Sequence, residues 1–213
     1  MRPLTDTIPK PLIPICGKPI LQHVVEALPE VIDELILVVG YKKEQIESVC
    51  GAVYCGKKVT YVTQENFAGG TGDALLCAKG LVTGKFMFMF ADDIHGKEAL
   101  AKLVTYEHAI LSTHSDIPER FGVFVLNEDG TLKEIIEKPE VPPSNLVSTG
   151  VFVAHPSIFE YKIQPSSTGE LYATDLINQY TRDFPMHVLE QKEWLPIGYP
   201  EHIRDAEAVL CPT

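Results

Sequence analysis

The chain has 213 residues, with 18 lysines and arginines against 29 aspartates and glutamates, which gives a formal net charge of −11 at pH 7. This length suits one compact domain that needs no metal or disulfide to hold its fold. The negative charge and the scattered basic residues argue against nucleic acid as the main partner. No apolar run approaches the roughly 20 residues that cross a bilayer, and no signal peptide precedes the first element, so we expect a soluble protein with no membrane partner.

The cysteines show no pattern typical of a disulfide framework or a zinc site. They are odd in number, lack any C-x-x-C spacing and mostly lie in apolar runs. We therefore expect a reducing, cytoplasmic compartment. The five positions are Cys16, Cys50, Cys55, Cys77 and Cys211.

The elements expected in the first half alternate between helices and strands. The segment "GKPILQHVVEALP" (17–29) spaces its apolar residues as one helix face, and Pro19 suits a first helical turn. The segment "ELILVVG" (34–40) is continuously apolar, which is typical of a strand covered on both faces. The other elements expected here are a helix at 41–50, a strand at 58–64, a helix at 72–79, a strand at 86–90 and a helix at 97–106.

The second half changes character. The segment "FGVFVLNEDGTLKEIIEKP" (121–139) predicts a hairpin around an Asp-Gly turn. We also expect a strand at 146–156, a helix at 172–184, a strand at 186–191 and a helix at 200–210. The first half predicts a doubly wound parallel sheet, to which the second half adds mixed strands. The expected fold class is therefore α/β, with a mostly parallel mixed sheet and helices on both of its faces.

Two adjacent acids stand at the end of the strand expected at 86–90. In "FMFMFADDIHG" (86–96), five large apolar residues run directly into Asp92 and Asp93. Ligands gather outside the carboxyl ends of strands in such sheets, and successive strand side chains point to opposite faces, so we expect one of the two acids to face a ligand. A carboxylate there suits Mg²⁺. The plain alternative is that one of them caps the next helix.

Three further segments place polar groups next to turns or strand ends. In "QENFAGGTGDAL" (64–75), Gln64 ends a strand and the glycines let the backbone approach a flat ligand. Lys10 lies between two prolines, which restrict its backbone and preorganise a cation. Glu137 and Lys138 form a pair able to bind a hydroxyl and a phosphate. Taken singly, the glycine loop is a weak signal for a ligand, Lys10 reads equally well as a solvated lysine, and Glu137 with Lys138 is more often a surface ion pair.

Together, and in this order, the segments resemble the sugar-1-phosphate nucleotidylyltransferases, the family that makes nucleoside-diphosphate sugars. The segment "PLTDTIPKPLIPICGKPIL" (3–21) is similar to the family's P-L-T-x-x-x-P-K-P-L-x-P-x-x-G-K-P, and the loop at 64–75 is similar to its base-binding Q…G-T-x-x-A-L. "FADDIHG" resembles its G-D-N metal motif, with Ala91 for the glycine and Asp93 for the asparagine. Later segments resemble its sugar site and its W-x-D-I-G-T-P motif: "RFGV" (120–123), "EKP" (137–139), "STGVFV" (148–153), "GELYATDLI" (169–177) and "WLPIGYPE" (194–201).

The resemblance implies a Rossmann-like fold and an enzyme that transfers a nucleotidyl group from a nucleoside triphosphate to a sugar 1-phosphate, with Mg²⁺ as cofactor. It makes the chain a single domain, 1–213, with a nucleotide-binding half at 1–115 and a sugar-binding half at 116–213. Lys10 would steady the phosphates, and Asp92 would be the magnesium ligand. Gln64, Gly70 and Thr71 would bind the nucleotide. The residues implied for the sugar phosphate are Phe121, Gly122, Glu137, Lys138, Thr149, Gly150 and Glu170.

The chain departs from the family pattern in two places. The family begins with a strand and a G-x-G-T-R loop that cradles the triphosphate, whereas this chain begins at "MRPLT", so we expect the natural protein to start about 20 residues upstream of Met1. Arg2 is out of register to replace the loop arginine. Pro196 stands where the family carries a second metal-binding aspartate. Magnesium would then rest on Asp92, with help from Asp93 or water, or metal-dependent turnover would be lost.

These departures keep a second function class open, a noncatalytic module that binds or senses a sugar nucleotide. A third hypothesis is a glycosyltransferase that uses the acidic motif, although the two lysines that precede prolines, Lys10 and Lys138, fit it less well. The family's first strand, which would precede Met1, is a central strand of the sheet. Without it, the neighbouring strands would be uncovered and could promote association between chains, so a homo-oligomer is a further expectation. The sequence does not identify the base or the sugar.

Overall fold

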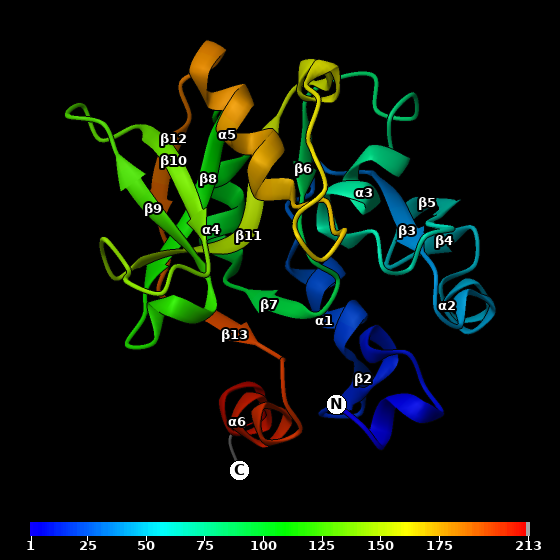
Figure 1. Ribbon diagram of the computed structural model, residues 1–213. Helices are drawn as coiled ribbons and strands as arrows, with labels where there is room; N and C mark the ends of the chain where they lie inside the picture. The colour runs from blue at the N-terminus through cyan, green and yellow to red at the C-terminus, as the bar shows by residue number, and fades with distance from the viewer. Residues whose placement is uncertain (212–213) are drawn as a thin grey trace. The chain divides into compact units, whose positions relative to one another are not determined.

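The computed structural model describes residues 1–211, and the chain divides into two compact units (Figure 1). The first unit comprises Met1–Thr63, Phe90–Ala101 and the chain from Glu193 onward. The second comprises Gln64–Met89 and Lys102–Lys192. The chain therefore passes between the units several times, and neither unit coincides with 1–115 or 116–213. The division of function at residue 115 stays a prediction.

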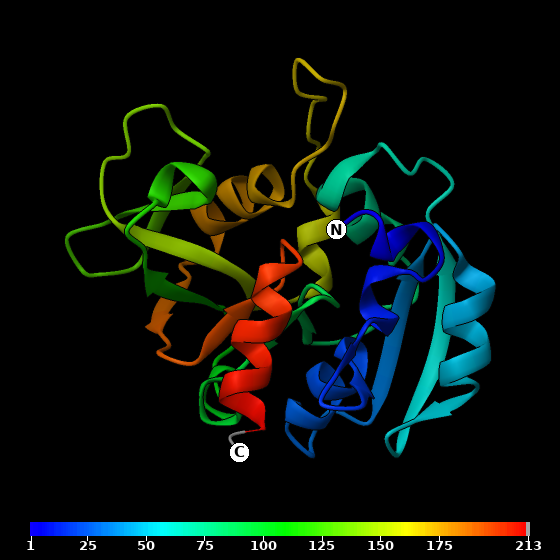
Figure 2. The same ribbon diagram turned by 90° about the horizontal axis from the view of Figure 1, so that it is seen from below.

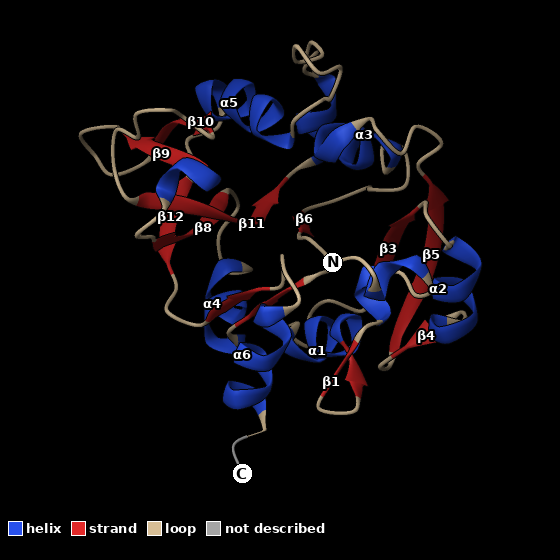
Figure 3. Cartoon of the chain, turned by 60° about the horizontal axis from the view of Figure 1, so that its bottom comes forward, coloured by secondary structure: helices blue, strands red, loops and turns tan. Residues whose placement is uncertain are grey.

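A three-stranded sheet organises the first unit. Its order is β3-β5-β4, where β3 is Glu34–Val39, β5 is Lys57–Thr63 and β4 is Val53–Tyr54. The strands β3 and β5 are parallel and lie side by side in Figure 3. The helix α2 (Lys43–Cys50) packs beside β5 (Figure 2), and α1 (Ile20–Ala27) buries one apolar face. The buried core of this unit is Leu12, Leu21, Val25, Leu35, Val39, Ile46, Cys50, Tyr54 and Val59.

Short elements complete the first unit. The strands β1 (Pro14–Ile15) and β2 (Lys18–Pro19) form a hairpin, and β7 (Asp93–His95) pairs antiparallel with β13 (Trp194–Pro196). The 3-10 helices η1 (Leu4–Asp6) and η2 (Lys10–Leu12) lie near the N-terminus. The helix α6 (Glu201–Leu210) packs against β1 and β13. The helix α4 (Lys97–Leu103) follows β7 and leads into the second unit.

A disulfide between Cys16 and Cys211 joins the β1–β2 hairpin to the end of α6. The expectation that the chain forms no disulfide is therefore wrong. The two cysteines are 195 residues apart in the sequence, so no local spacing reveals a pair that folding brings together. The argument from cysteine content to a cytoplasmic location loses its support.

A six-stranded sheet organises the second unit. Its order is β10-β9-β11-β8-β12, and β6 also pairs with β11. Of these pairs, only β12 and β8 are parallel. The bounds are β6 Phe86–Phe88, β8 Ala109–His114, β9 Gly122–Leu126, β10 Leu132–Glu137, β11 Leu146–Ala154 and β12 His187–Glu190. The α/β class with mixed strand directions is confirmed, but the parallel share is smaller than expected because β11 pairs antiparallel with β6, β8 and β9, and β9 pairs antiparallel with β10.

The helix α5 (Ala173–Asp183) packs on β10, and α3 (Gly70–Cys77) packs on α5. Asn178 of α5 binds the outer edge of β10 twice. Its Oδ1 accepts the backbone N–H of Ile135 at 2.7 Å, and its Nδ2 donates to the carbonyl oxygen of Ile135 at 2.8 Å. The 3-10 helices of this unit are η3 (Pro118–Arg120) and η4 (Pro156–Glu160). Its buried core includes Leu75, Ile110, Phe124, Leu132, Ile135, Phe152, Ile158, Leu176, Ile177 and Tyr180.

The strand expected at 86–90 is shorter and less buried than its composition predicts. It covers Phe86–Phe88, and each residue from 86 to 90 is partly exposed. Among residues 1–211, β6 pairs with a single strand, β11. The continuous apolar run therefore does not mark a strand that is completely buried. No helix in the part of the chain that the structure describes is long and apolar enough to span a bilayer.

Candidate functional site

The first unit brings together the lysine and the aspartate that the sequence singles out. Lys10 begins η2, directly after Pro9, whose backbone is extended. Its Nζ donates to Oδ2 of Asp92 at 2.5 Å, and the two side chains are 25% and 32% exposed. A cation and an anion are thus paired in a half-buried setting, where screening by water is weaker than at an open surface.

Asp93 lies in different surroundings from its neighbour. Its Oδ1 accepts the backbone N–H of Ile197 at 3.2 Å. Burial, followed by the charge of Asp92, raises the pKa of Asp93 to about 6. Because α4 begins only at Lys97, neither acid occupies the residue before that helix, and the capping alternative is wrong. The two adjacent acids therefore have different partners. Asp92 binds Lys10, whereas Asp93 accepts a hydrogen bond from the backbone directly after β13.

The acids alone do not build a complete metal site. Within residues 1–211, no group of three or more histidine, cysteine, aspartate or glutamate side chains could hold a metal ion. Magnesium commonly uses one or two carboxylates and takes its other oxygens from water and substrate phosphates. Asp92, whose side chain is 32% exposed, fits the role of a single carboxylate in such a shared site.

The glycine loop in the second unit is tied to the segment that carries Glu170. The amide of Gly72 donates to the carbonyl oxygen of Leu171 at 2.7 Å, and the amide of Leu171 donates to the carbonyl oxygen of Gly69 at 2.8 Å. Gly70 has φ +82°, and a Cβ there would lie 2.6 Å from the same Leu171 oxygen. A glycine is therefore required at position 70 both by backbone conformation and by the close approach of a second chain segment.

Two predicted nucleotide-binding side chains in this loop make hydrogen bonds within the protein. The hydroxyl oxygen of Thr71 accepts the backbone N–H of Ala173, the first residue of α5, at 3.1 Å. Nε2 of Gln64 donates to the carbonyl oxygen of Gly70 at 3.1 Å and to Oδ2 of Asp73 at 2.8 Å. Asp73 was not anticipated, although it belongs to the loop segment. Its only signal in the sequence is a carboxylate shortly after a glutamine that ends a strand.

Several of the residues implied for the sugar lie together at the open end of the β9–β10 hairpin. Gly122 pairs with Glu137, and a Cβ at 122 would lie 2.7 Å from Cγ2 of Ile135 and 3.4 Å from Oε2 of Glu137. Burial raises the pKa of Glu137, and the charge of Lys138 partly opposes that shift. Nζ of Lys138 is 3.9 Å from Oε1 of Glu137, and the backbone of Lys138 donates to the carbonyl oxygen of Phe121 at 3.0 Å.

The remaining predicted residues of the sugar set are held by other contacts. The hydroxyl of Thr149 donates to the carbonyl oxygen of Leu111 at 3.3 Å and accepts from Nε2 of Gln191 at 2.7 Å, and Thr149 is only 1% exposed. Gly150, at φ +77°, lies where the pairing of β11 with β8 is irregular. Tyr172 donates to Oε2 of Glu170 at 2.9 Å. The hydroxyl of Thr149 therefore makes its hydrogen bonds inside the protein, and a ligand at this position would have to contact the backbone.

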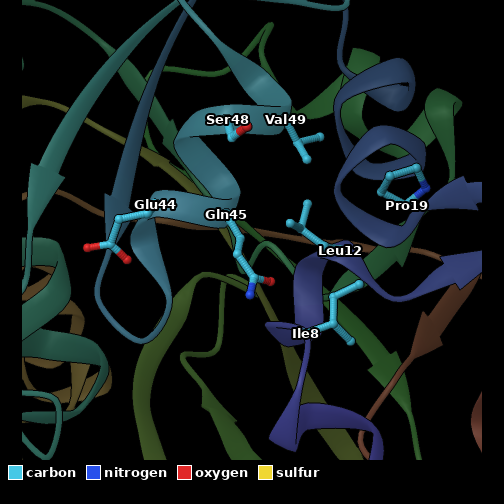
Figure 4. Close-up of a pocket in the computed structure, with 7 residues that line it drawn as sticks. All are labelled: Ile8, Leu12, Pro19, Glu44, Gln45, Ser48 and Val49. Carbon is cyan, nitrogen blue, oxygen red and sulfur yellow. The ribbon is translucent and has the colours of Figure 1, made fainter.

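A shallow cavity of about 530 Å³ in the first unit involves none of these residues. Figure 4 shows its lining, which comes from α2, from η2 and the residues before it, and from the end of β2. The residues are Ile8, Leu12, Pro19, Glu44, Gln45, Ser48 and Val49.

Comparison with known proteins decides the family. Residues 1–211 match the family model described as nucleotidyl transferase. The chain belongs to this nucleotidyl transferase family. The resemblance inferred from the motifs is confirmed, and so is the enzyme family that it named.

Two archaeal proteins illustrate the sequence similarity. This nucleotidyl transferase is 37% identical over 223 residues to UTP--glucose-1-phosphate uridylyltransferase AglF of Haloferax volcanii, and the match covers 99% of this chain and 91% of AglF. It is 34% identical over 211 residues to the bifunctional protein GlmU of Methanococcus maripaludis, covering 97% of this chain and 50% of GlmU. The chain thus spans about half the length of the GlmU proteins that it matches.

A solved structure shares the fold. A Bacillus anthracis protein assigned as a glucose-1-phosphate thymidylyltransferase and crystallised with sucrose superposes with a TM-score of 0.87 at 26% identity. The match covers 98% of this chain and 89% of that one. The Rossmann-like fold expected from the sequence is therefore confirmed.

Proposed function

We propose that the protein transfers a nucleotidyl group from a nucleoside triphosphate to a sugar 1-phosphate, which yields a nucleoside-diphosphate sugar and pyrophosphate. The observation that carries the proposal is the contact between Lys10 and Asp92 at 2.5 Å. These two residues come from the segment similar to the family's P-L-T…P-K-P run and from the segment similar to its metal motif, and they are 82 residues apart in the sequence. Their contact supports a common role.

The chemistry suits residues that position and neutralise charge. An oxygen of the sugar phosphate attacks the α-phosphorus in line, and pyrophosphate leaves with its electron pair. Little covalent work is required of the protein, so rate comes from orientation and electrostatic stabilisation. Lys10 would bind phosphate oxygens, exchanging part of its contact with Asp92 for a substrate anion.

A magnesium ion fits this proposal as a shared ligand of protein and substrate. Asp92 would hold it, together with phosphate oxygens and water, and the ion would neutralise charge on the phosphates. Asp93 is less suited to the same task, because burial raises its pKa and Ile197 already occupies Oδ1.

The second unit would supply recognition of the base and the sugar. Gln64, Gly70 and Thr71 are proposed for the nucleotide. For the sugar phosphate, the carboxyl group of Glu137, whose pKa burial raises, is proposed to bind a sugar hydroxyl. The other proposed members of this set are Phe121, Gly122, Lys138, Thr149 through its backbone, Gly150 and Glu170.

A second candidate function is noncatalytic binding of a sugar nucleotide. It is favoured by Pro196, which pairs with Asp93 in β13 and β7 and offers no oxygen ligand from its side chain. This candidate predicts binding of a nucleoside-diphosphate sugar without turnover. A cytoplasmic location and a homo-oligomer remain predictions alongside both functions.

The test measures pyrophosphate release and thermal stability with the same protein. The chain is incubated with each common nucleoside triphosphate, glucose 1-phosphate or N-acetylglucosamine 1-phosphate, and Mg²⁺. We expect pyrophosphate release with at least one combination and, for Lys10→Met, a fall of about tenfold or more, which corresponds to about 1.4 kcal/mol of lost transition-state stabilisation.

Lys18→Met is the matched control. It removes a lysine that also pairs with a carboxylate, Glu26 at 2.9 Å, but lies outside the proposed set. A rise in melting temperature with nucleoside-diphosphate sugars but no pyrophosphate would favour the noncatalytic candidate. If no nucleotide gives turnover and none raises the melting temperature, both candidate functions are refuted.

A further inference from the structure

The side-chain amide of Gln64 is fixed in one orientation by two acceptors. Its Nε2 donates to Oδ2 of Asp73 at 2.8 Å and to the carbonyl oxygen of Gly70 at 3.1 Å. A carboxylate and a backbone carbonyl can only accept hydrogen bonds, so the nitrogen and not the oxygen of the amide must face them. Both hydrogens of the amide nitrogen are thereby used.

The carbonyl oxygen of Gln64 is left for another partner. Oε1 accepts no hydrogen bond from any residue within the described range 1–211. Gln64 is only partly buried, so the residue keeps some access to solvent. The side chain therefore offers a ligand an acceptor and no donor.

Asp73 owes its position to a glycine. It lies in the first turn of α3, and a Cβ at Gly69 would lie 2.6 Å from Cγ of Asp73 and would overlap its carboxylate. A carboxylate near the start of a helix is stabilised by the helix dipole wherever it points. That effect alone does not require the carboxylate to fold back over Gly69 and bind Gln64, so the hydrogen bond adds a second, directional role.

We propose that Asp73 is a positioning residue that presents Oε1 of Gln64 to the base, so that the protein selects bases with a ring N–H on their pairing edge. The inference rests on the proposed function, in which Gln64 binds the nucleotide. Uracil and thymine carry such an N–H at N3, and guanine carries one at N1. Adenine at N1 and cytosine at N3 present a lone pair instead. An acceptor that meets a lone pair leaves both groups without a hydrogen bond, which disfavours binding.

The experiment measures affinities by calorimetry for UTP, dTTP, GTP, ATP and CTP in the presence of Mg²⁺. For the unmodified chain, we expect the best of the first three to bind about tenfold more tightly than the better of the last two. In Asp73→Ala, the amide of Gln64 is free to turn and can offer its nitrogen to a lone pair. We expect this ratio to fall to within about threefold, while the affinity for the preferred nucleotide falls by less than the ratio does.

Two further variants separate orientation from charge and from folding. Glu65→Gln removes an exposed carboxylate of the same loop, one that makes no hydrogen bond to Gln64 in the described part of the chain. We expect the affinity ratio of this variant to stay within about twofold of the unmodified value. Asp73→Asn keeps the side-chain shape and one acceptor oxygen, so its ratio should lie between those of the unmodified chain and Asp73→Ala.

The possible results distinguish this inference from the proposed function. Tighter binding of ATP or CTP by the unmodified chain, or an equal loss for all five nucleotides in Asp73→Ala, overturns the inference and leaves the proposed function standing. Absence of binding for every nucleotide overturns the proposed function and the inference with it. Because the readout is binding, it applies equally to a catalytic and to a noncatalytic protein.

Discussion

Pro196 lies directly opposite Asp93 in the antiparallel pair of β13 and β7. Residues opposite one another in such a pair place their side chains on the same face, with Cβ atoms about 5 Å apart. An aspartate at position 196 would therefore add a second carboxylate beside Asp93, whose pKa burial already raises to about 6. The proline leaves that face of the pair with one acid.

We expect Pro196→Asp to make stability depend on magnesium. Without metal, two carboxylates directly opposite each other should cost about 0.2–1 kcal/mol, and Mg²⁺ should reverse that loss by binding between them. The measurement is the melting temperature near pH 8, with a chelator and with Mg²⁺. Pro196→Asn, which adds no charge, is the control. An equal response to Mg²⁺ in the unmodified chain and both variants would contradict the prediction.

Gly70→Ala should destabilise the glycine loop. The backbone at this position has φ +82°, and the new Cβ would lie 2.6 Å from the carbonyl oxygen of Leu171. Holding a residue with a side chain in the left-handed region costs about 1–3 kcal/mol, and the close contact adds to it. Urea denaturation gives the free energy of unfolding. Gly84→Ala serves for comparison, since a Cβ there meets nothing within 4 Å, and similar losses in the two variants would count against the argument.

The pair of His108 and Tyr180 predicts a loss of stability in acid. The Tyr180 hydroxyl accepts the backbone N–H of His155 at 3.1 Å and lies 2.8 Å from Nδ1 of His108. Burial, and then His155, lower the pKa of His108 below its ordinary value of 6.5. The unfolded chain therefore binds this proton more readily than the folded chain. The free energy of unfolding should fall as the pH drops below that ordinary value and level off once it passes the lower pKa of the folded state.

The variant His108→Asn tests that slope. Asparagine keeps an acceptor close to the position of Nδ1 but cannot take up a proton, so we expect its stability to decline less between about pH 7 and about pH 5 than that of the unmodified chain. Urea titrations across this range provide the measurement. His114→Asn removes an exposed histidine and should keep the original slope. A slope unchanged by His108→Asn would refute the assignment.

Reduction of the Cys16–Cys211 disulfide should lower the free energy of unfolding by about 2–4 kcal/mol. Alkylation counts the thiols directly. Cys50, Cys55 and Cys77 are free, so the denatured chain should take up three labels before reduction and five afterwards. Cys55→Ser should melt at the same temperature as the unmodified chain, with and without reductant. Five labels without reduction would show that the bridge is absent in solution.

Elements defined by one continuous pattern could be predicted from the sequence. The apolar run of β3 and the apolar periodicity of α5 each lie within a single stretch, and the structure places both within a residue or two of the expected bounds. The pair of β7 and β13 could not be predicted in this way. Each strand has three residues, too few for a period, and their partnership depends on contacts between segments about a hundred residues apart.

In the candidate site, too, residues marked by their local sequence could be predicted, whereas contacts between distant segments could not. Lys10 and Asp92 each stand out by their neighbours in the sequence, and their motifs suggested a shared role, although only the fold shows the hydrogen bond between them. Asp73 did not stand out, because an acid in the first turn of a helix is common for reasons of the helix dipole alone. Thr149 stood out for its motif, but its hydroxyl turns to Leu111 and Gln191, which lie in distant parts of the chain.

The two hydrogen bonds from Asn178 to Ile135 have a consequence for how the protein behaves at high concentration. By occupying both backbone groups of one residue on an outer strand, a helix side chain imitates the neighbour that an additional strand would provide. A strand from another chain could pair with β10 at Ile135 only after displacing the side-chain amide of Asn178. We therefore expect Asn178 to protect this edge strand against the strand addition that leads to aggregation.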